Sequence, residues 1–167
     1  MCLVCATYLE EKRCGELTAE REKVYQEHVK RKIEAREEKG KDKELSKQND
    51  SVHCVTFDLE AVLDTLCSNV SQVHYKRKLA VYNLTVYSLG DREATCYVWD
   101  ETEGRKGSCE IGTCLSRYIQ SLPQDVKHVI LYSDTCGGQN RNKFVASALH
   151  YIVKHSDNIQ VIRIYRM

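Results

Sequence analysis

The amino-acid sequence predicts an α/β domain, built on a mixed five-stranded sheet with flanking helices and preceded by a long charged helix. Three observations support this fold class. The density of charged residues falls near residue 50, segments of strand composition and of helical spacing alternate after that point, and one strand is apolar along almost its whole length. The predicted order after residue 50 is strand, strand, strand, helix, strand, helix, strand.

The N-terminal residues differ from the rest of the chain in charge. Residues 1–50 hold 12 basic and 12 acidic side chains, whereas residues 51–167 hold 13 and 12 in more than twice the length. Between Thr18 and Lys47 there is no proline and strong helix formers dominate, with Thr18 suited to the N-cap. We therefore expect a cysteine-containing segment and an exposed charged helix within 1–50, and a separate core domain over 51–167.

The first three strands are predicted from their β-branched and aromatic composition. Residues 52–57 (VHCVTF) form a short strand that is followed by Asp58. Residues 75–89 and 94–99 are rich in Val, Tyr, Leu and Thr, and a Gly-Asp turn dipeptide separates them. The sequence therefore predicts an antiparallel hairpin after the first strand.

Two helices alternate with two strands in the remaining chain. Apolar residues recur at helical spacing over residues 108–122, with Ser108 as the expected N-cap, and again over residues 142–155. Residues 126–133 (VKHVILYS) form a near-continuous apolar strand, which is the pattern of a parallel strand buried on both faces. Residues 159–165 supply the last strand. We expect both helices to pack on the sheet that these strands complete.

An aspartate follows the first strand, and another follows the strand after the first helix. These two strands can lie side by side and parallel, and ligand sites in such sheets form at the carboxyl ends of parallel strands. Asp58 and Asp134 would then be neighbours, and a divalent cation such as Mg²⁺ would relieve their repulsion. Two such ions about 3.5–4 Å apart are the usual machinery for attack on a phosphodiester. In the alternative interpretation, both aspartates are turn residues that end their strands.

A glycine-rich segment, YSDTCGGQNRN, extends from Tyr132 to Asn142. Two glycines between a buried strand and a helix let the backbone approach a ligand closely. The polar residues after them can donate hydrogen bonds to phosphates or to base edges. The candidate substrate-binding residues are Gly137, Gly138, Gln139, Asn140, Arg141 and Asn142. The segment does not match the phosphate loop of nucleoside triphosphatases, which argues against that class.

Four segments of this chain resemble a known family: TFDLEAVL around Asp58, YKRKLAVYNLTVY, EIGTCL and YSDTCGGQNRN. They are similar to a transposon-derived family of uncharacterised animal proteins whose core is a ribonuclease H-like domain of the DDE/D transposase type. The likeness runs over most of residues 1–167. It implies a ribonuclease H-like fold in which Asp58 and Asp134 are the first two catalytic, metal-binding carboxylates. It also implies Mg²⁺ or Mn²⁺ as cofactor and DNA as partner.

This sequence departs from the family pattern after the last predicted strand. In that fold a third acidic residue comes from a helix beyond the fifth strand, whereas this sequence stops at Met167 and Asp157 precedes the strand. The resemblance therefore implies a nuclease acting on DNA phosphodiesters that is degenerate or incomplete in this chain, truncated before the last helix and inactive as given. An uncovered last strand would also favour self-association. The alternative function is a domesticated, non-catalytic module that binds protein or nucleic acid.

Cysteines supply two further candidate sites. Cys2, Cys5 and Cys14 could form part of a Zn²⁺ site, which needs a fourth ligand such as His28. The alternative for these cysteines is a set of reduced thiols. Cys136 could act as a nucleophile on a strand-to-helix turn, but the order of elements does not match an α/β-hydrolase. The sequence therefore leaves the zinc site open and disfavours the nucleophile.

Charge and hydropathy limit the partners of the chain. No apolar run approaches the roughly 20 residues that span a bilayer, and the opening of the sequence lacks the basic start and apolar stretch of a signal peptide. We expect an intracellular protein, in the nucleus or the cytoplasm, without membrane contact. Lys and Arg total 25 against 24 acidic residues, so any attraction to DNA must come from local patches.

Overall fold

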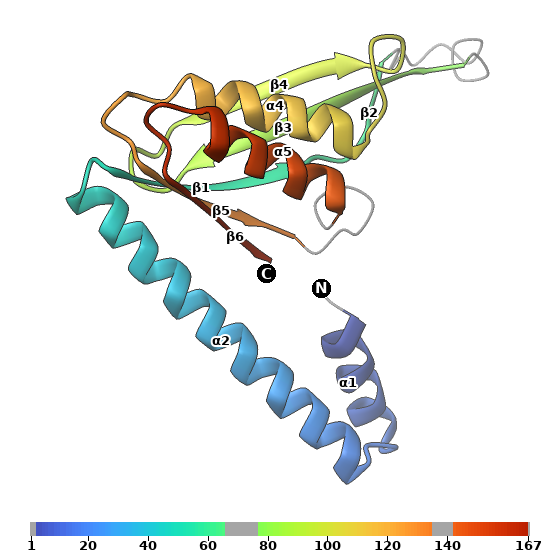
Figure 1. Cartoon of the computed structure of the whole chain (residues 1–167). Coiled ribbons are helices and arrows are strands. Elements are labelled where there is room, and N and C mark those ends of the chain that lie inside the picture. Colours follow the sequence, from blue (N-terminus) through green and yellow to red (C-terminus); the bar gives the residue numbers. More distant parts are fainter. Residues whose placement is uncertain (1–2, 66–76, 135–141, 167) are drawn as a thin grey trace. The chain divides into compact units, whose positions relative to one another are not determined.

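The computed structural model describes residues 3–65, 77–134 and 142–166 (Figure 1). Within these residues the chain forms four helices and six strands. The helices are α1 (Leu3–Cys14), α2 (Ala19–Gln48), α4 (Ser108–Gln120) and α5 (Lys143–His155). The strands are β1 (Val52–Leu59), β2 (Leu63–Thr65), β3 (Leu79–Ser88), β4 (Ala94–Asp100), β5 (His128–Ser133) and β6 (Val161–Arg166).

The chain divides into two compact units, Met1–Lys41 and Asp42–Met167. The sequence predicts a boundary near residue 50, because the charged composition continues to that point. The division falls earlier, since the last turns of α2 belong with the sheet. There the Tyr132 hydroxyl donates a 2.6 Å hydrogen bond to the buried carboxylate of Asp42.

The first unit is a hairpin of α1 and the first part of α2. The rings of Tyr8 and Tyr25 stack with centroids 3.7 Å apart, and the Tyr8 hydroxyl donates a 2.9 Å hydrogen bond to Glu22. The helix predicted over residues 18–47 is confirmed, and the Thr18 hydroxyl accepts a 3.3 Å hydrogen bond from the backbone of Arg21 at its start. α1 lies in the segment for which the sequence predicts no helix.

The second unit contains a mixed, open sheet. β1 is parallel to β5, and β5 is parallel to β6. β3 is antiparallel to β1, to β4 and to the short β2. The path through the sheet is β2-β3-β1-β5-β6, with β4 paired to β3. The predicted α/β class, the antiparallel hairpin and the parallel neighbours are confirmed, and β2 raises the predicted five strands to six.

The predicted helices of the second unit are confirmed, but one predicted cap is wrong. Ser108 is the first residue of α4, and the N-cap is Gly107, whose position has no side-chain capping hydrogen bond. At the start of α5, the Asn142 side chain does cap the helix. Among the helices in the described parts of the chain, none combines the length and the apolar character needed to cross a membrane.

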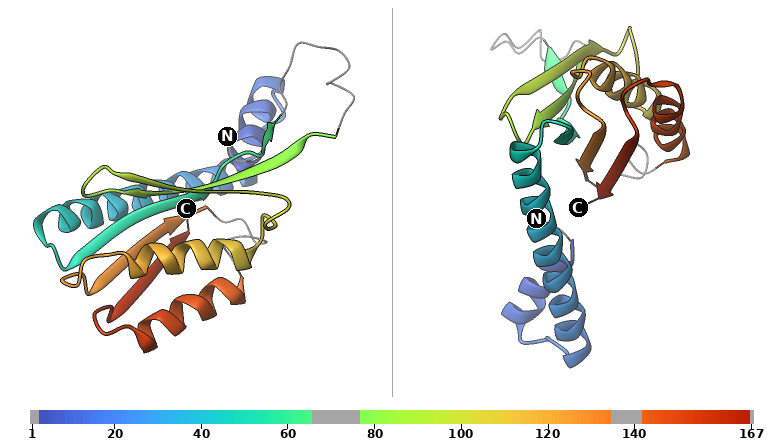
Figure 2. Two further views of the ribbon diagram at one scale, coloured as in Figure 1. Left: turned by 90° about the horizontal axis from the view of Figure 1, so that it is seen from above. Right: turned by 60° about the vertical axis from the view of Figure 1, so that its left-hand side comes forward.

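Helices α4 and α5 lie side by side on one face of the sheet, as Figure 2 shows from two further directions. Between them and the sheet lies the main hydrophobic core. Alternate strand residues point into it, as the two-residue period of a strand requires. The buried contributors include Val55, Phe57, Leu84, Ile111, Leu115, Val129, Leu131, Val145 and Leu149.

The opposite face of the sheet carries a smaller apolar cluster. It contains Cys54 of β1 and Ile130 and Tyr132 of β5, and the Tyr165 ring of β6 stacks on Tyr132 with centroids 5.1 Å apart. These are the strand positions that alternate with the main core. Continuing the same alternation to the ends of β1 and β5 places the two candidate aspartates on this second face.

β6 is the last strand along the sheet, with a partner on one side in the described residues. The analysis of the sequence leads us to expect an uncovered apolar edge here. Val161 is 37% exposed, whereas Ile162 and Ile164 are partly buried against the main core, and Ile159 before the strand is only 2% exposed. The expected partial exposure therefore holds along β6, most clearly for Val161, and is wrong for Ile159, because that side chain packs under the helices.

Candidate functional site

The two predicted aspartates lie at the ends of neighbouring parallel strands. In the register of β1 and β5, Thr56 is the partner of Tyr132. Asp58 and Asp134 each follow two residues later, in the same direction and with the same alternation. Both side chains therefore belong to one edge and one face of the sheet, which is where ligand sites form in such folds.

The charges of these two aspartates interact. Partial burial raises the pKa of the Asp58 carboxyl above its ordinary value, and the negative charge of Asp134 raises that pKa further. A hydrogen bond from the Leu59 backbone acts in the opposite direction and lowers the pKa. Two acids in such proximity destabilise one another when both are ionised. A bound cation would remove that repulsion.

A third acidic side chain, Glu60, lies close by and was missed in the sequence analysis. Its backbone N–H donates a 2.9 Å hydrogen bond to the Asn83 carbonyl of β3, which extends the pairing beyond β1. Its carboxylate accepts a 2.9 Å hydrogen bond from the hydroxyl of Thr85, the residue opposite Asp58 in the sheet. The charge of Glu60 also raises the pKa of Asp58. The Asp-x-Glu spacing at the strand end was the signal that could have revealed it.

The three acids do not form a ready three-ligand centre. Within the described residues, no three His, Cys, Asp or Glu side chains come together as a group that could hold a metal ion. Glu60 is held by Thr85 on β3, whereas Asp134 follows β5 on the other side of β1. The candidate metal ligands are therefore the pair Asp58 and Asp134.

Asp157 is placed far along the sheet from this pair. It precedes β6, which runs parallel to β5, so it lies at the end where these strands begin. Asp58 and Asp134 lie at the end where β1 and β5 finish. This topology separates Asp157 from the pair by the length of the strands.

Most of the predicted substrate-binding segment lies outside the described residues: Gly137, Gly138, Gln139, Asn140 and Arg141. Asn142 is described. Its side-chain oxygen accepts 3.0 Å hydrogen bonds from the backbone N–H groups of Phe144 and Val145, which caps α5. The capping role explains this asparagine without a ligand.

The predicted zinc ligands are not brought together. Cys2 lies outside the described residues, and Cys5 and Cys14 both belong to α1. Nine residues of helix separate them by about 13 Å along the axis. Thiolates that share a zinc ion each lie about 2.3 Å from it. Cys5 and Cys14 therefore cannot bind the same ion while α1 is intact.

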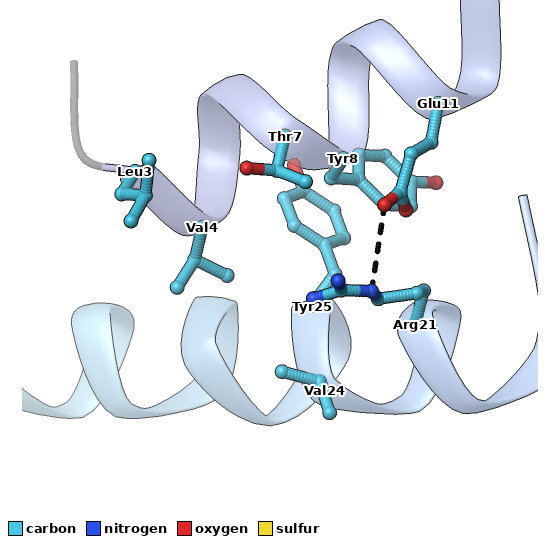
Figure 3. A pocket seen from close by; sticks show the side chains of 8 residues that line it. All are labelled: Leu3, Val4, Thr7, Tyr8, Glu11, Arg21, Val24 and Tyr25. Carbon is cyan, nitrogen blue, oxygen red and sulfur yellow. Dashed lines mark ion pairs between the residues drawn. The ribbon is translucent and has the colours of Figure 1, made fainter. Parts of the chain in front are cut away.

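The first unit holds a pocket between α1 and α2, with a volume of about 220 Å³ (Figure 3). Leu3, Val4 and Val24 line one part of it. Near the other part, Arg21 and Glu11 form an ion pair with 3.4 Å between nitrogen and oxygen. The stacked rings of Tyr8 and Tyr25 also line this pocket, so its residues are those that hold the two helices together.

The start of β1 holds a partly buried histidine. A ring nitrogen of His53 and the hydroxyl of Tyr118 lie 2.9 Å apart, at hydrogen-bonding distance. Burial lowers the pKa of His53, and the charge of Asp91 partly opposes this effect. Burial also raises the pKa of Tyr118 to about 12. The pair is neutral at physiological pH and is satisfied internally. It lies at the opposite end of β1 from Asp58.

The candidate nucleophile Cys136 lies outside the described residues.

In comparisons with known proteins, no family model, no curated protein and no solved structure matches this chain. The functional interpretation of the site therefore rests on its own residues and on the sequence segments described above.

Proposed function

We propose that the second unit is a ribonuclease H-like domain of the DDE/D transposase type, directed at DNA phosphodiesters, with Mg²⁺ or Mn²⁺ bound by Asp58 and Asp134. The observation that carries the proposal is the placement of two electrostatically coupled carboxylates at the ends of β1 and β5. The mixed sheet supports it, because an antiparallel hairpin beside parallel strands is the arrangement that the sequence resemblance implies.

The residues present fit a hard divalent cation. Mg²⁺ is bound through oxygen atoms and commonly uses one or two protein carboxylates, with water and substrate phosphates in its other positions. When bound, such an ion supplies charge neutralisation and polarises a phosphate oxygen. Asp58 and Asp134 would hold it. Glu60, fixed by Thr85, adds negative potential beside Asp58.

The sheet positions Asp58 rigidly. β1 is paired on one side with β3 and on the other with β5, so the backbone that carries Asp58 is held from both sides. Sites built on paired strands hold ligand geometry better than sites on loops. This chain's contribution is therefore to orient one carboxylate firmly and to place a second one next to it.

The non-catalytic alternative has one observation in its favour. Within the described residues the site offers a pair of carboxylates and no three-ligand cluster. With two carboxylates we expect weak metal binding and slow or absent strand cleavage. The non-catalytic module predicts no metal binding at this pair.

Manganese titration followed by NMR separates the two functions. In an isotope-labelled chain, paramagnetic Mn²⁺ should broaden signals at the ends of β1 and β5 first. Asp58→Asn and Asp134→Asn should each remove that broadening, and Asp157→Asn, which changes an exposed acid at the opposite end of the sheet, should leave it intact. Broadening that survives Asp58→Asn, or that is absent altogether, would refute the proposed metal site.

Any cleavage of labelled DNA gives a second reading of the same site. Slow Mn²⁺-dependent cleavage should disappear in Asp58→Asn and Asp134→Asn and should persist in Asp157→Asn. Cleavage that persists in both site variants would assign the activity to other residues or to a contaminant.

A further inference from the structure

One surface outside the candidate metal site combines exposed cations with exposed rings. It is the side of α5 that faces away from the sheet, here called the α5 outer face. Its members are Lys143, Phe144, His150, Tyr151, Lys154 and His155. The opposite side of the same helix buries Val145, Leu149 and Ile152 in the main core.

The outer face consists of two parallel stripes. Lys143, His150 and Lys154 recur at a spacing of seven and four residues, which places them along one side of the helix. Phe144, Tyr151 and His155 have the same spacing one residue later and form the adjacent stripe. A row of basic side chains therefore runs beside a row of rings.

The rings are exposed although they are large. Phe144 is 57% exposed and Tyr151 is 62% exposed. Tyr151 stacks on His155 with centroids 4.0 Å apart, and a ring nitrogen of His155 lies 2.9 Å from the Tyr151 carbonyl. These contacts hold the tyrosine ring in a defined place on the surface. Covering these two rings with a partner would remove their apolar surface from water, which is favourable.

The charged side chains of α5 itself are all basic, and the nearest acid is Asp157, which lines a further depression with Tyr151 and His155 just beyond the end of the helix. α5 contains no acidic residue. Two shallow depressions flank the rings, one of about 570 Å³ along α5 and one of about 480 Å³ between α4 and α5, and no acidic side chain lines either. Arg117 of α4 lines the second depression. Within the described parts of the chain, no ion pair involves Lys143, Lys154 or Arg117. The partner that complements this face is an anion.

We propose that the α5 outer face binds single-stranded nucleic acid, with phosphates along the basic stripe and unpaired bases on Phe144 and Tyr151. Proteins that bind single strands combine a positively charged track with aromatic rings on which bases stack. An acidic protein helix fits less well, because it would need a continuous apolar seam. Here the ring stripe has only two large apolar side chains, Phe144 and Tyr151, with the small Ala148 between them, and it ends at His155.

This inference goes beyond the proposed nuclease function and does not rest on it. α4 and α5 cover the face of the sheet opposite to the one that carries Asp58 and Asp134. Binding at the α5 outer face requires no metal. It can therefore be measured in the presence of EDTA, where the candidate metal site makes no contribution.

The test is fluorescence anisotropy of a labelled oligothymidine of about 12 nucleotides, a length within the range of single-stranded binding sites. With the whole chain in EDTA, Phe144→Ala and Tyr151→Ala should each weaken binding by about fivefold or more. Lys143→Gln and Lys154→Gln should each reduce the slope of log affinity against log salt by about 0.7. Circular dichroism checks that each variant is folded.

Matched controls lie elsewhere on the second unit. Val98→Ala changes an apolar side chain that is 62% exposed on β4, and Lys127→Gln removes an exposed lysine before β5. Both should bind like the unchanged chain. Three results would overturn the proposal: affinity that is unaffected by Phe144→Ala and Tyr151→Ala, equal affinity for a duplex of the same length, or polyglutamate binding with the same sensitivity to those two variants.

Discussion

The two ends of β1 hold ionisable side chains under opposite conditions. At its start, His53 and Tyr118 lie at hydrogen-bonding distance, so burial is compensated by a neutral partner. At its end, Asp58 faces the negative charge of Asp134, and burial and repulsion raise its pKa together. The first pair links β1 to α4 through this contact. The second pair costs stability while both acids are charged. A cation-binding site has the same cost when no cation balances its charges.

The comparison depends on a well-packed strand between these two ends. Phe57 is 1% exposed in the main core, directly before Asp58. We expect Phe57→Ala to lower the free energy of unfolding by about 3–5 kcal/mol, because it leaves a cavity under the sheet. Urea denaturation measures this loss. Val98→Ala, at an exposed position, should stay within about 0.5 kcal/mol. A loss below about 1 kcal/mol for Phe57→Ala would contradict the described core.

A smaller effect is expected on the face that carries the acids. Tyr132→Phe removes the hydroxyl that donates to the buried Asp42 carboxylate. Leaving that carboxylate without this donor should cost about 1–3 kcal/mol of unfolding free energy. The matched control is Tyr151→Phe, which changes an exposed tyrosine and should have no effect. Equal stabilities for the two variants would mean that the end of α2 does not belong with the sheet.

The two ends of β1 should also respond to acid in opposite directions. At the His53 end the folded pKa is lowered, so the unfolded chain takes up more protons as the pH falls. The stability that His53 contributes is present when the pH is above about 6.5, the ordinary pKa of histidine. It is lost as the pH falls below that value. We expect His53→Gln to reduce the loss of stability between about pH 7.5 and about pH 5.5, measured by urea midpoints. Equal losses of stability in both proteins over this pH range would show that His53 does not contribute to the pH dependence.

The smallest effect is expected at the Asp58 end. The pKa of Asp58 is raised in the folded chain. Its contribution to the free energy of unfolding is therefore favourable when the pH is below about 3.9, the ordinary pKa of aspartate, and is lost as the pH rises through the raised pKa. At neutral pH, Asp58→Asn should therefore stabilise the metal-free chain, by no more than about 1 kcal/mol because solvent screens the pair. Asp157→Asn should have no effect. Destabilisation by Asp58→Asn would show that the folded chain stabilises the negative charge of Asp58 and does not repel it.

Strand pairing was the part of the fold most open to prediction from sequence. The apolar run of β5 indicates a strand buried on both faces, and this places it beside β1. The juxtaposition of Asp58 and Asp134 follows from that pairing alone. Two elements were not predicted. β2 has only three residues, which is shorter than two periods of strand alternation and gives no periodic signal. α1 has only a weak apolar side, apart from the buried ring of Tyr8.

Two features of the second face depend on contacts between distant residues and could not be predicted. Asp42 has the same local sequence context as the exposed acids of α2, and only its meeting with Tyr132 buries it. Glu60 is fixed by Thr85, a contact set by the register of β1 against β3. Local composition carries no information on either contact, although the Asp-x-Glu spacing at the end of β1 does mark Glu60 as a candidate acid. The substrate-binding assignment of Asn142 had the opposite difficulty, since a donor suited to phosphates is equally suited to capping a helix.

The central claim is that Asp58 and Asp134 form one electrostatic site. NMR titration of the Asp58 side-chain carboxyl carbon measures its pKa directly in the unchanged chain, in Asp134→Asn and in the control Asp157→Asn. The account predicts a pKa above the ordinary value in the unchanged chain, a lower pKa in Asp134→Asn and no change in Asp157→Asn. A pKa of Asp58 that is the same in all three proteins would contradict it.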